Sequence, residues 1–371
     1  MSGRRDKVRG QEGQVRRAEG LSATLEDVAR HAGVSPATVS RCLNSPNSVR
    51  PNKREKVTRA IQELNYVPHG AARALASRKS RMIGAVFPSL DTDLFGGALE
   101  AFQGEVAQGG YTVVVASSAY DPAQEQRHIR NLLESGVDAL MLVGAERSEE
   151  AYRLIRAKGI PYVVIWVSQA PYPHNLAENL APDLRHDCVG FDNWAAAADV
   201  TDYLLSLGHR HFAMISGTIA GNDRARLRLE GVRAALKAKS LDLAPDHLHE
   251  RPFQVEDGRQ AFRCLMQGET PPTAIICGAE PFAYGALFEA KEMGLSVPED
   301  VSVVGFDDMW LAAHLSPALT TVRTPRTKMG RQAARFLLSR LMGQAVADPP
   351  PLETKLVIRK STGPPPGSSG L

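Results

Sequence analysis

From Arg81 onward, short runs rich in β-branched residues alternate with amphipathic stretches of helical length through most of the chain. Strand–helix alternation on this scale predicts parallel, doubly wound sheets with helices on both faces. Two such halves fit, one ending near residue 185 and the other near residue 320. The expected strands are 83–87, 111–116, 139–143, 162–166, 211–215, 274–277 and 301–305, and the helices between them lie near 95–108, 122–135, 148–158, 194–207, 225–238, 257–267 and 281–293.

The composition is that of a globular protein, with 43% hydrophobic and 23% charged residues. No apolar run reaches the roughly 18–20 residues that a membrane helix needs. The N-terminal residues carry charge without the apolar core of a secretory signal. The four cysteines are scattered and lack metal-ligand spacing. We therefore expect a cytoplasmic protein with reduced thiols, no metal ion and no cofactor.

The charge is distributed unevenly along the chain. Residues 1–80 hold 16 Lys+Arg and 7 Asp+Glu, a net of +9, and the remaining residues hold 28 and 34, a net of −6. A basic N-terminal region joined to an acidic body indicates that the N-terminal region meets a polyanion such as nucleic acid. The alternative is that this charge only keeps the surface soluble.

Three short helical patterns follow one another within residues 24–68, at 24–32, 35–43 and 51–64. Thr24 and Asp27 form a capping-box pattern at the start of the first. Gly33 suits a sharp turn, and Ser35 followed by Pro36 is a favoured helix start. Two short helices joined by a glycine turn describe a helix-turn-helix, whose second helix can enter the major groove of DNA.

The first turns of the second helix expose small and hydroxyl side chains before Arg41. Arg41 is long enough to read a guanine edge with two hydrogen bonds, worth about 1–3 kcal/mol of discrimination. Thr38 and Ser40 suit phosphate oxygens, and the basic and polar residues near position 50 suit the DNA backbone. On these residues alone, a three-helix bundle with solvated polar side chains is an equally good interpretation.

The stretch TLEDVARHAGVSPATVSRCLN, its continuation REKVTRAIQELNYVPH and the segment ARALASRKSRMIG resemble the N-terminal signature of the lactose/galactose repressor family. In that family, residues at the start of the second helix read bases. Pro36 and Ala37 offer no hydrogen bonds there, so the resemblance leaves more of the direct readout to Arg41. The expected DNA contacts are Thr24, Ser35, Pro36, Ala37, Thr38, Ser40, Arg41, Asn44, Arg50, Asn52, Lys53 and Leu75.

Residues 69–80 are similar to the hinge helix of that family, and Leu75 stands where the family wedges a leucine into the minor groove. Without the resemblance, Leu75 would be interpreted as a packing residue. One hinge per protomer implies a homodimer on a palindromic operator in double-stranded DNA. After LVIRKSTG only the eight residues PPPGSSGL follow, without heptads, so we expect a dimer without a tetramerising tail.

The resemblance continues through GAVFPSLDTDLFGGALEAF, YLLSLGHRHFAMISG, GLSVPEDVSVVGFDD and LTTVRTPRTKMGRQAA. It implies a type I periplasmic-binding-protein-like body, with two doubly wound parallel-sheet subdomains and a ligand cleft between them. The expected domains are a disordered basic arm at 1–23, a helix-turn-helix domain at 24–68, a hinge helix at 69–80, an effector-binding and dimerisation domain at 81–362 and a disordered tail at 363–371. The expected subdomains are 81–185 plus 322–345, and 186–321 plus 346–362.

Ligands of doubly wound sheets bind beyond the carboxyl ends of the strands. The loops expected there combine aromatic rings with carboxylates and an arginine, a mixture that suits a sugar or a similar polyol. Arg228 and Asp307 match family positions that hydrogen-bond the effector. For each aromatic residue, core packing is an equally good interpretation. The expected effector contacts are Asp91, Phe95, Tyr120, Trp166, Asp192, Arg228, Glu280 and Asp307.

Two departures from the family pattern affect the effector site. The family commonly has Asn-Asp where this chain has Ala279-Glu280, and a Pro-rich insertion occupies residues 170–182. The identity of the effector therefore cannot be carried over from the family. Trp166, Trp194 and Trp310 are all expected near the cleft.

Three rival functions are weighed against an effector-controlled repressor. An enzyme is disfavoured because no GxSxG, P-loop, GxGxxG, HExxH or paired-carboxylate motif is present, so we expect no catalytic residues. An exported sugar-binding protein would leave the basic N-terminal region unexplained. A repressor that responds to a partner protein, or to no effector, stays open because Ala279 cannot make the usual side-chain hydrogen bond.

Overall fold

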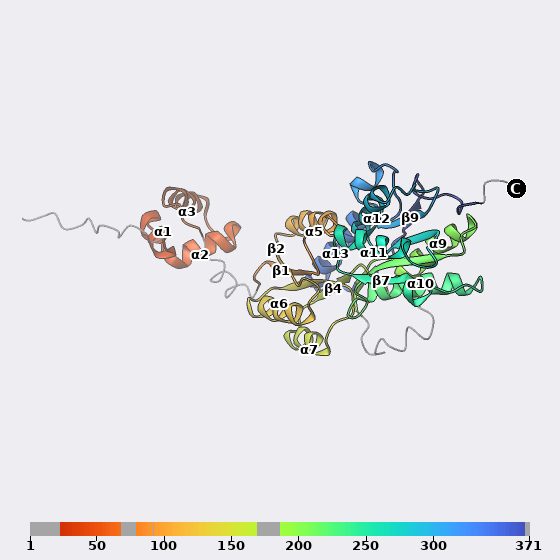
Figure 1. The fold of residues 1–371 in the computed structure, drawn as a ribbon. Coiled ribbons are helices and arrows are strands. Elements are labelled where there is room, and N and C mark those ends of the chain that lie inside the picture. The colour runs from red at the N-terminus through yellow and green to blue at the C-terminus, as the bar shows by residue number, and fades with distance from the viewer. Residues whose placement is uncertain (1–22, 68–78, 92, 169–185, 368–371) are drawn as a thin grey trace, which may run out of the picture. The chain divides into compact units, whose positions relative to one another are not determined.

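The computed structural model describes residues 23–67, 79–91, 93–168 and 186–367. The chain divides into two compact units, residues 1–80 and residues 81–371, and each is described by itself (Figure 1). Four predicted features lie outside the described residues: the arm up to residue 22, the hinge segment 68–78 with Leu75, the insertion at 170–182 and the tail from residue 368.

Within residues 23–67, the N-terminal unit contains three helices, α1 (Leu25–Ala32), α2 (Pro36–Asn44) and α3 (Pro51–Glu63), with the 3-10 turn η1 (Pro46–Ser48) before α3. Thr24 caps α1, since its hydroxyl accepts the Asp27 N–H while the Asp27 carboxylate accepts the Thr24 N–H. Gly33 ends α1 at a φ of 64°, a left-handed conformation that glycine adopts without steric cost. Val28, Val39 and Val57 fill the core between the helices. Each predicted helix limit is within one residue of the observed one.

The first sheet of the body has the strand order β2-β1-β3-β4-β5, and all of its strands are parallel. Because successive side chains of a strand point to opposite faces, the side chains of β1 contribute to two separate hydrophobic cores. Ile83, Ala85 and Phe87 join one core and Val86 joins the other. The strands are β1 (Met82–Phe87), β2 (Thr112–Ser117), β3 (Ala139–Val143), β4 (Tyr162–Ile165) and β5 (Cys188–Val189).

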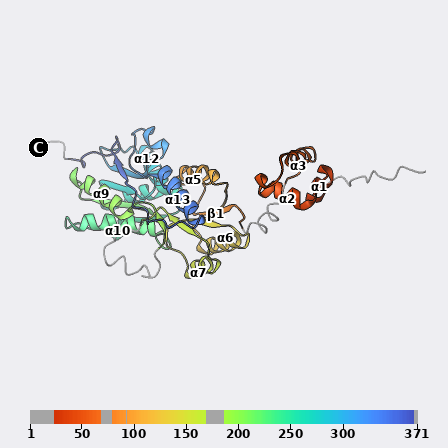
Figure 2. The same ribbon diagram turned by 180° about the vertical axis from the view of Figure 1, so that it is seen from behind.

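In the described part of the chain, four helices cover the two faces of this sheet. Helices α5 (Gly96–Gln108) and α13 (Arg326–Leu341) pack together on one face, and α6 (Pro122–Glu134) and α7 (Glu149–Lys158) pack together on the other (Figure 2). Met329, Phe336 and Leu337 of α13 are buried in the core below α5. A helix from late in the sequence is thus part of the first subdomain.

The second sheet has the strand order β11-β10-β9-β8-β6-β7. Helices α9 (Asn193–Ser206) and α10 (Asp223–Lys237) pack against each other, as do α11 (Val255–Met266) and α12 (Glu280–Glu292). The strands are β6 (Phe212–Gly217), β7 (Leu248–Arg251), β8 (Ala274–Cys277), β9 (Ser302–Asp307), β10 (Thr320–Arg323) and β11 (Lys355–Val357). The short 3-10 turn η2 (Pro245–His247) precedes β7, and the 3-10 turn η3 (Trp310–Ala313) follows β9. Strand β11 is antiparallel to β10, so this sheet is mixed rather than wholly parallel.

The structure corrects the expected division between the subdomains. The expected boundary at residue 185 falls before β5, yet β5 pairs with β4 and completes the first sheet. The expected crossing between residues 321 and 322 falls inside β10, which belongs to the second sheet. Both errors arise because β5 and β10 are short strands that the sequence pattern does not predict.

Candidate functional site

Helix α2 presents a mostly small and polar surface around one buried residue, Val39. Pro36, Ala37, Arg41 and Asn44 are exposed. Polar and basic side chains on an exposed short helix are suited to base edges and phosphates in a major groove.

The hydroxyl groups of Ser35 and Thr38 stabilise the start of α2. The Ser35 Oγ accepts the Thr38 N–H at 3.3 Å and lies 2.9 Å from the Thr38 hydroxyl. Further along, the Asn44 amide donates to the Ser40 Oγ at 3.3 Å. Ser35 therefore caps the helix, and its oxygen remains on the exposed surface beside the predicted contacts.

Basic side chains lie near the start of α3. Arg50 occupies the N-cap, and the first turn contains no acidic residue. Arg50, Asn52 and Lys53 are all exposed. Thr24, at the start of α1, is exposed as well, with its side chain engaged in the capping box. The predicted DNA contacts within residues 23–67 thus lie at the surface of the N-terminal unit or cap its helices.

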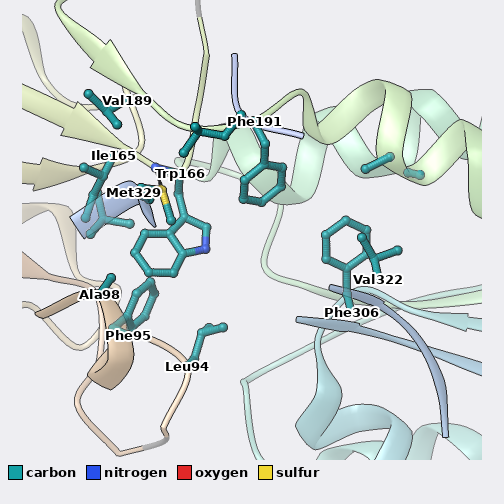
Figure 3. Packing of buried hydrophobic residues seen from close by; sticks show 14 of the residues in the cluster. Leu94, Phe95, Ala98, Ile165, Trp166, Val189, Phe191, Phe306, Val322 and Met329 are labelled. Carbon is teal, nitrogen blue, oxygen red and sulfur yellow. Dashed lines mark hydrogen bonds between the residues drawn. The ribbon is translucent and has the colours of Figure 1, made fainter. Parts of the chain in front are cut away.

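The body holds a small cavity between its two sheets. Residues of both subdomains line it, and four of the predicted effector contacts are among them: Phe95, Tyr120, Trp166 and Arg228. Ala279 also lines it. Figure 3 shows Trp166 and Phe95 on the side of the first subdomain and Phe306 on the side of the second.

Arg228 is a buried cation in the lining of this cavity. Its Nε donates to the Asn193 Oδ1 at 2.9 Å, its Nη1 donates to the Gly278 carbonyl, and its guanidinium lies over the Phe306 ring at 3.7 Å. Burial lowers the pKa of Arg228 to about 10, a shift that nearby Asp307 opposes. These contacts fix the guanidinium plane before any ligand arrives.

Trp166 forms part of the facing wall, with its side chain 1% exposed and edge-on to Phe95 at 4.8 Å. Its carbonyl accepts the Asn193 Nδ2 at 2.8 Å, so Asn193 joins Trp166 to Arg228. The Trp166 Nε1 is buried and has no hydrogen-bond partner among the described residues. Figure 3 shows this nitrogen turned toward the side where Phe306 lies.

Asp307 lies at the end of β9 with a φ of 115°, a conformation that a non-glycine residue rarely adopts. Its Oδ1 accepts the Thr324 hydroxyl at 3.4 Å, and its buried Oδ2 has no partner among the described residues. Burial raises the pKa of Asp307, while the Arg228 and Arg326 guanidinium groups lower it. Asp307 is close to Arg228 without being part of the cavity lining.

Three other predicted effector contacts have structural partners and do not line the cavity. Asp192 caps α9, since its carboxylate accepts the Ala195 N–H at 3.0 Å. Glu280 is completely buried and accepts hydrogen bonds from Tyr284, Thr321 and the Met309 N–H. Asp91 is exposed and its carboxylate accepts the Gln254 amide at 3.5 Å.

The sequence analysis did not single out several other residues that line the cavity. Phe253 stacks on Tyr120 with ring centroids 4.5 Å apart, and Asn222 and Arg224 reach the cavity from the start of α10. Phe253 follows β7, whose sequence LHER carries too many charged residues to suggest a strand. Trp310 is 68% exposed and does not line the cavity, and neither does Trp194, so of the three tryptophans only Trp166 does.

The two subdomains are also joined beside the cavity. The Asp223 carboxylate, at the start of α10, accepts the N–H groups of Ala145 and Glu146, which follow β3. Arg226 forms an ion pair with Glu146 at 3.1 Å. Gly144 allows this approach, because a Cβ there would fall 1.7 Å from the Arg224 Nη1.

Within the residues that the structure describes, no group of three His, Cys, Asp or Glu side chains is placed to hold a metal ion. No helix in this part of the chain is long and apolar enough to cross a membrane.

A model of bacterial regulatory proteins of the lacI family matches residues 24–69, and a periplasmic-binding-protein-like domain model matches residues 201–362. The chain is 33% identical over 345 residues to the HTH-type transcriptional repressor CytR of Escherichia coli strain K12, covering 92% of this chain and 96% of CytR. This chain belongs to the lacI family of bacterial regulatory proteins. This lacI-family chain is also 36% identical over 341 residues to the HTH-type transcriptional regulator GntR of Pseudomonas aeruginosa, covering 91% of this chain and 95% of GntR.

Solved structures agree with the assignment. The lac repressor dimer bound to operator and the anti-inducer ONPF aligns with a TM-score of 0.78 at 30% identity, covering 92% of this chain and all of that one. A complex of the transcriptional regulator CelR with cellobiose aligns with a TM-score of 0.65 at 30% identity, covering 91% of this chain and 99% of CelR. The predicted family and architecture are confirmed, and this lacI-family member is a DNA-binding transcriptional regulator.

Proposed function

We propose that this protein is a homodimeric repressor that binds a palindromic operator, and that a small polyhydroxylated molecule in the body cavity changes its operator affinity. The observation that carries the proposal is the cavity itself, whose lining includes Arg228, with its guanidinium fixed by Asn193, and Trp166, whose buried indole N–H has no partner among the described residues. Buried polar groups in proteins are normally hydrogen-bonded, so an unpartnered donor in a cavity favours a ligand that supplies an acceptor.

The chemistry of the cavity wall supports a sugar-like effector. Aromatic rings of Phe95, Trp166 and Phe253 offer apolar faces on which a sugar ring can stack, and Arg228 offers charged donors for hydroxyl oxygens. The cellobiose bound by CelR supports the same class. Typical coupling between an effector site and a DNA site is about 1–3 kcal/mol, which would change operator affinity roughly 5- to 150-fold.

Exposed apolar side chains on the second subdomain support the dimer. Trp310 on η3 is 68% exposed and Phe288 on α12 is 44% exposed. Both elements pack into one core, which contains Ala312 and Leu287. Large exposed apolar residues on neighbouring elements are typical of protein–protein interfaces.

The test has two stages. Double-stranded fragments are first selected from a random pool by the purified protein, and sedimentation gives its oligomeric state on and off the selected DNA. The selected site is expected to have two-fold symmetry and to bind one dimer. Sugars, polyols, nucleosides and phosphosugars are then titrated while tryptophan emission and operator binding are followed. Intact operator binding without any small-molecule response would instead favour control by a partner protein or no effector control. Failure to select a symmetric site would contradict the proposal.

A further inference from the structure

After β11 the chain returns into the second subdomain as a short segment, residues 359–363, which we call the strap. Ser361, at its centre, is completely buried. The Ser361 carbonyl accepts the Val303 N–H at 2.9 Å. The Ser361 hydroxyl donates to the Val303 carbonyl at 2.6 Å and accepts the Thr320 N–H at 2.8 Å. The strap is therefore bonded to the first residues of both β9 and β10.

Uncharged groups hold the next part of the strap. The Thr362 hydroxyl lies 2.9 Å from the Tyr203 hydroxyl of α9 and 2.9 Å from the Thr320 hydroxyl. The Gly363 N–H donates to the Ser302 Oγ at 3.0 Å. Hydrogen bonds between uncharged partners are individually modest in water, so several of them share the work of holding the strap.

His209 binds the end of the strap from the loop between α9 and β6, and its side chain is completely buried. Its Nε2 lies 2.9 Å from the Gly363 carbonyl and 3.1 Å from the Ser302 Oγ, and its Nδ1 lies 2.9 Å from the Thr273 Oγ1. A carbonyl oxygen can only accept, so Nε2 carries the proton that is shared with Gly363. In the neutral ring Nδ1 is then the acceptor, and the Thr273 hydroxyl donates to it.

The surroundings of His209 favour the neutral ring. Among the described residues, every hydrogen-bond partner of the imidazole is uncharged. The neighbouring Arg210 guanidinium donates to the His209 carbonyl at 2.7 Å, and the titratable group nearest the strap is the Tyr203 phenol that contacts Thr362. Burial lowers the pKa of His209, a shift that the hydrogen bond to Gly363 opposes. A positive charge on this ring would be buried beside another cation and without a carboxylate partner.

The other end of the strap reaches the junction between the subdomains. The Arg359 guanidinium donates to the Leu319 carbonyl at 2.7 Å and to the Asp308 carboxylate at 2.6 Å. Arg326 of α13 donates to the Asp308 carbonyl at 3.4 Å and to the Asp93 carbonyl of the first subdomain at 3.1 Å. Arg359, Asp308 and Arg326 thus connect the strap to the first subdomain.

We infer that the strap is an acid-sensitive switch, in which protonation of His209 releases residues 359–363 and frees Asp308 from Arg359. When the strap leaves, water reaches the ring and stabilises the imidazolium. The bound strap is most stable above pH 6.5, the ordinary pKa of histidine, and is released more often as the pH falls below that value. This input is separate from the DNA and effector sites.

Amide hydrogen exchange of the full-length protein at about pH 7.5, 6.5 and 5.5 tests the switch, with each rate divided by the intrinsic rate at that pH. The reporters of the strap are the N–H groups of Val303, Thr320 and Gly363. The Asp308 N–H, which donates to the Thr321 hydroxyl at 3.4 Å, reports on the far end. All four are expected to open up to about tenfold more often at pH 5.5 than at pH 7.5, because a released histidine is then about ten times more often charged than neutral.

Two matched variants assign the pH dependence to one ring. His209→Gln cannot gain a proton, while its amide group can still donate toward the Gly363 carbonyl. In this variant the reporters are expected to exchange without the pH dependence, whatever constant change the substitution causes. His314→Gln makes the same change at an exposed histidine beside Trp310 and is expected to keep the wild-type pH dependence.

Three outcomes would contradict the inference. Equal protection of the strap reporters at pH 7.5 and 5.5 in the wild type would overturn the switch, and this result does not depend on the folding of any variant. Persistence of the pH dependence in His209→Gln would assign it to another group. Faster exchange of the strap reporters with an unchanged Asp308 N–H would overturn the link from the strap to the subdomain junction.

Discussion

At the residue scale, Arg41 is the exposed side chain of α2 best able to distinguish one base from another. It stands on the surface of α2, while its neighbours Pro36 and Ala37 offer no hydrogen bonds. Arg41→Ala is therefore expected to lower affinity for the selected operator by about 5- to 150-fold, corresponding to roughly 1–3 kcal/mol, and to relax the preference at one base pair. Fluorescence anisotropy with the operator and its single-base variants measures both effects. Arg41→Lys is the control, since it retains the charge and loses the two-pronged donor, and full specificity in either variant would reject direct readout.

Glu280 gives a second residue-scale prediction, this time about pH. Burial raises the pKa of Glu280 from its ordinary value of 4.5 to about 7, although hydrogen bonds from Tyr284 and Thr321 oppose the shift. A carboxyl group with a raised folded-state pKa keeps its proton on folding, so wild-type stability falls as pH rises from about 4.5 to 7. Glu280→Gln removes this titration. The difference in free energy of unfolding between variant and wild type should thus move in favour of the variant across that window.

The measurement is a series of urea unfolding curves at pH values on both sides of the window. The lost or altered hydrogen bonds of Glu280→Gln add a constant offset, so the slope with pH is the quantity that tests the prediction. A difference that stays flat between pH 4.5 and 7 would show that the Glu280 carboxyl titrates normally.

Of the predicted effector contacts, the three aromatic residues and Arg228 line the cavity, whereas the four carboxylates do not. Arg228 was predicted because it matches a family position that hydrogen-bonds the effector, and the structure places it in the cavity lining. The sequence did not show that Glu280, unlike Arg228, lies outside the cavity lining. An acidic residue after a strand can either bind a ligand or accept hydrogen bonds that fix a loop. Only the three donors around Glu280 reveal that its oxygens are already occupied.

At the element scale, the start of α10 holds the two subdomains together on one side of the cavity. The Asp223 carboxylate accepts two backbone N–H groups from the loop after β3. Asp223→Ala removes hydrogen bonds to a charged acceptor, worth about 1.5–3 kcal/mol each, so opening of this junction should become at least about tenfold more frequent. Amide hydrogen exchange at Ala145 and Glu146 measures this opening.

The control for this junction is Arg226→Ala, which breaks only the partly exposed ion pair with Glu146. Exposed pairs contribute about 0–1 kcal/mol, so exchange at Ala145 should change little in that variant. Equal acceleration in both variants would mean that the junction depends on charge in general rather than on the Asp223 carboxylate.

Elements with a strong hydrophobic period were predictable, and those held by tertiary packing were not. β3 and β8 match their predicted limits because their residues are uniformly buried and apolar. β7, with the sequence LHER, is an edge strand whose side chains are mostly half-buried or exposed, so no alternation marks it. Missing β7 also meant missing Phe253, which follows it and reaches the cavity.

At the scale of the whole molecule, the basic N-terminal region determines how operator binding responds to salt. Residues 1–80 have a net charge of +9, against a net of +3 for the complete chain. Each phosphate contact releases condensed counterions, so the logarithm of operator affinity should fall linearly with the logarithm of salt concentration. Lys53→Ala is expected to reduce the slope by about 1 and to weaken specific and non-specific DNA alike. Binding of both kinds is measured by anisotropy from low to moderate salt, and an unchanged slope would remove Lys53 from the phosphate contacts.

The overall architecture was predictable from alternation and resemblance, whereas the path of the chain between the sheets was not. The chain leaves the first sheet after β5, crosses back after β10 to form α13, and crosses again to form β11. Short strands at these crossings carry little periodic signal. Their positions are set by pairing with neighbours that are distant in sequence, such as Thr321 with Val357.

The late position of α13 has a consequence for synthesis of the protein on the ribosome. Residues 24–67 contain every element of the helix-turn-helix and can form its core as soon as they emerge. The first sheet of the body, by contrast, lacks half of one helical layer until residues 326–341 have been made, because Met329 and Leu337 supply part of that core. The nascent body therefore carries an uncovered apolar face while all of the second sheet except β11 is being translated, and exposed apolar surface of this kind favours aggregation.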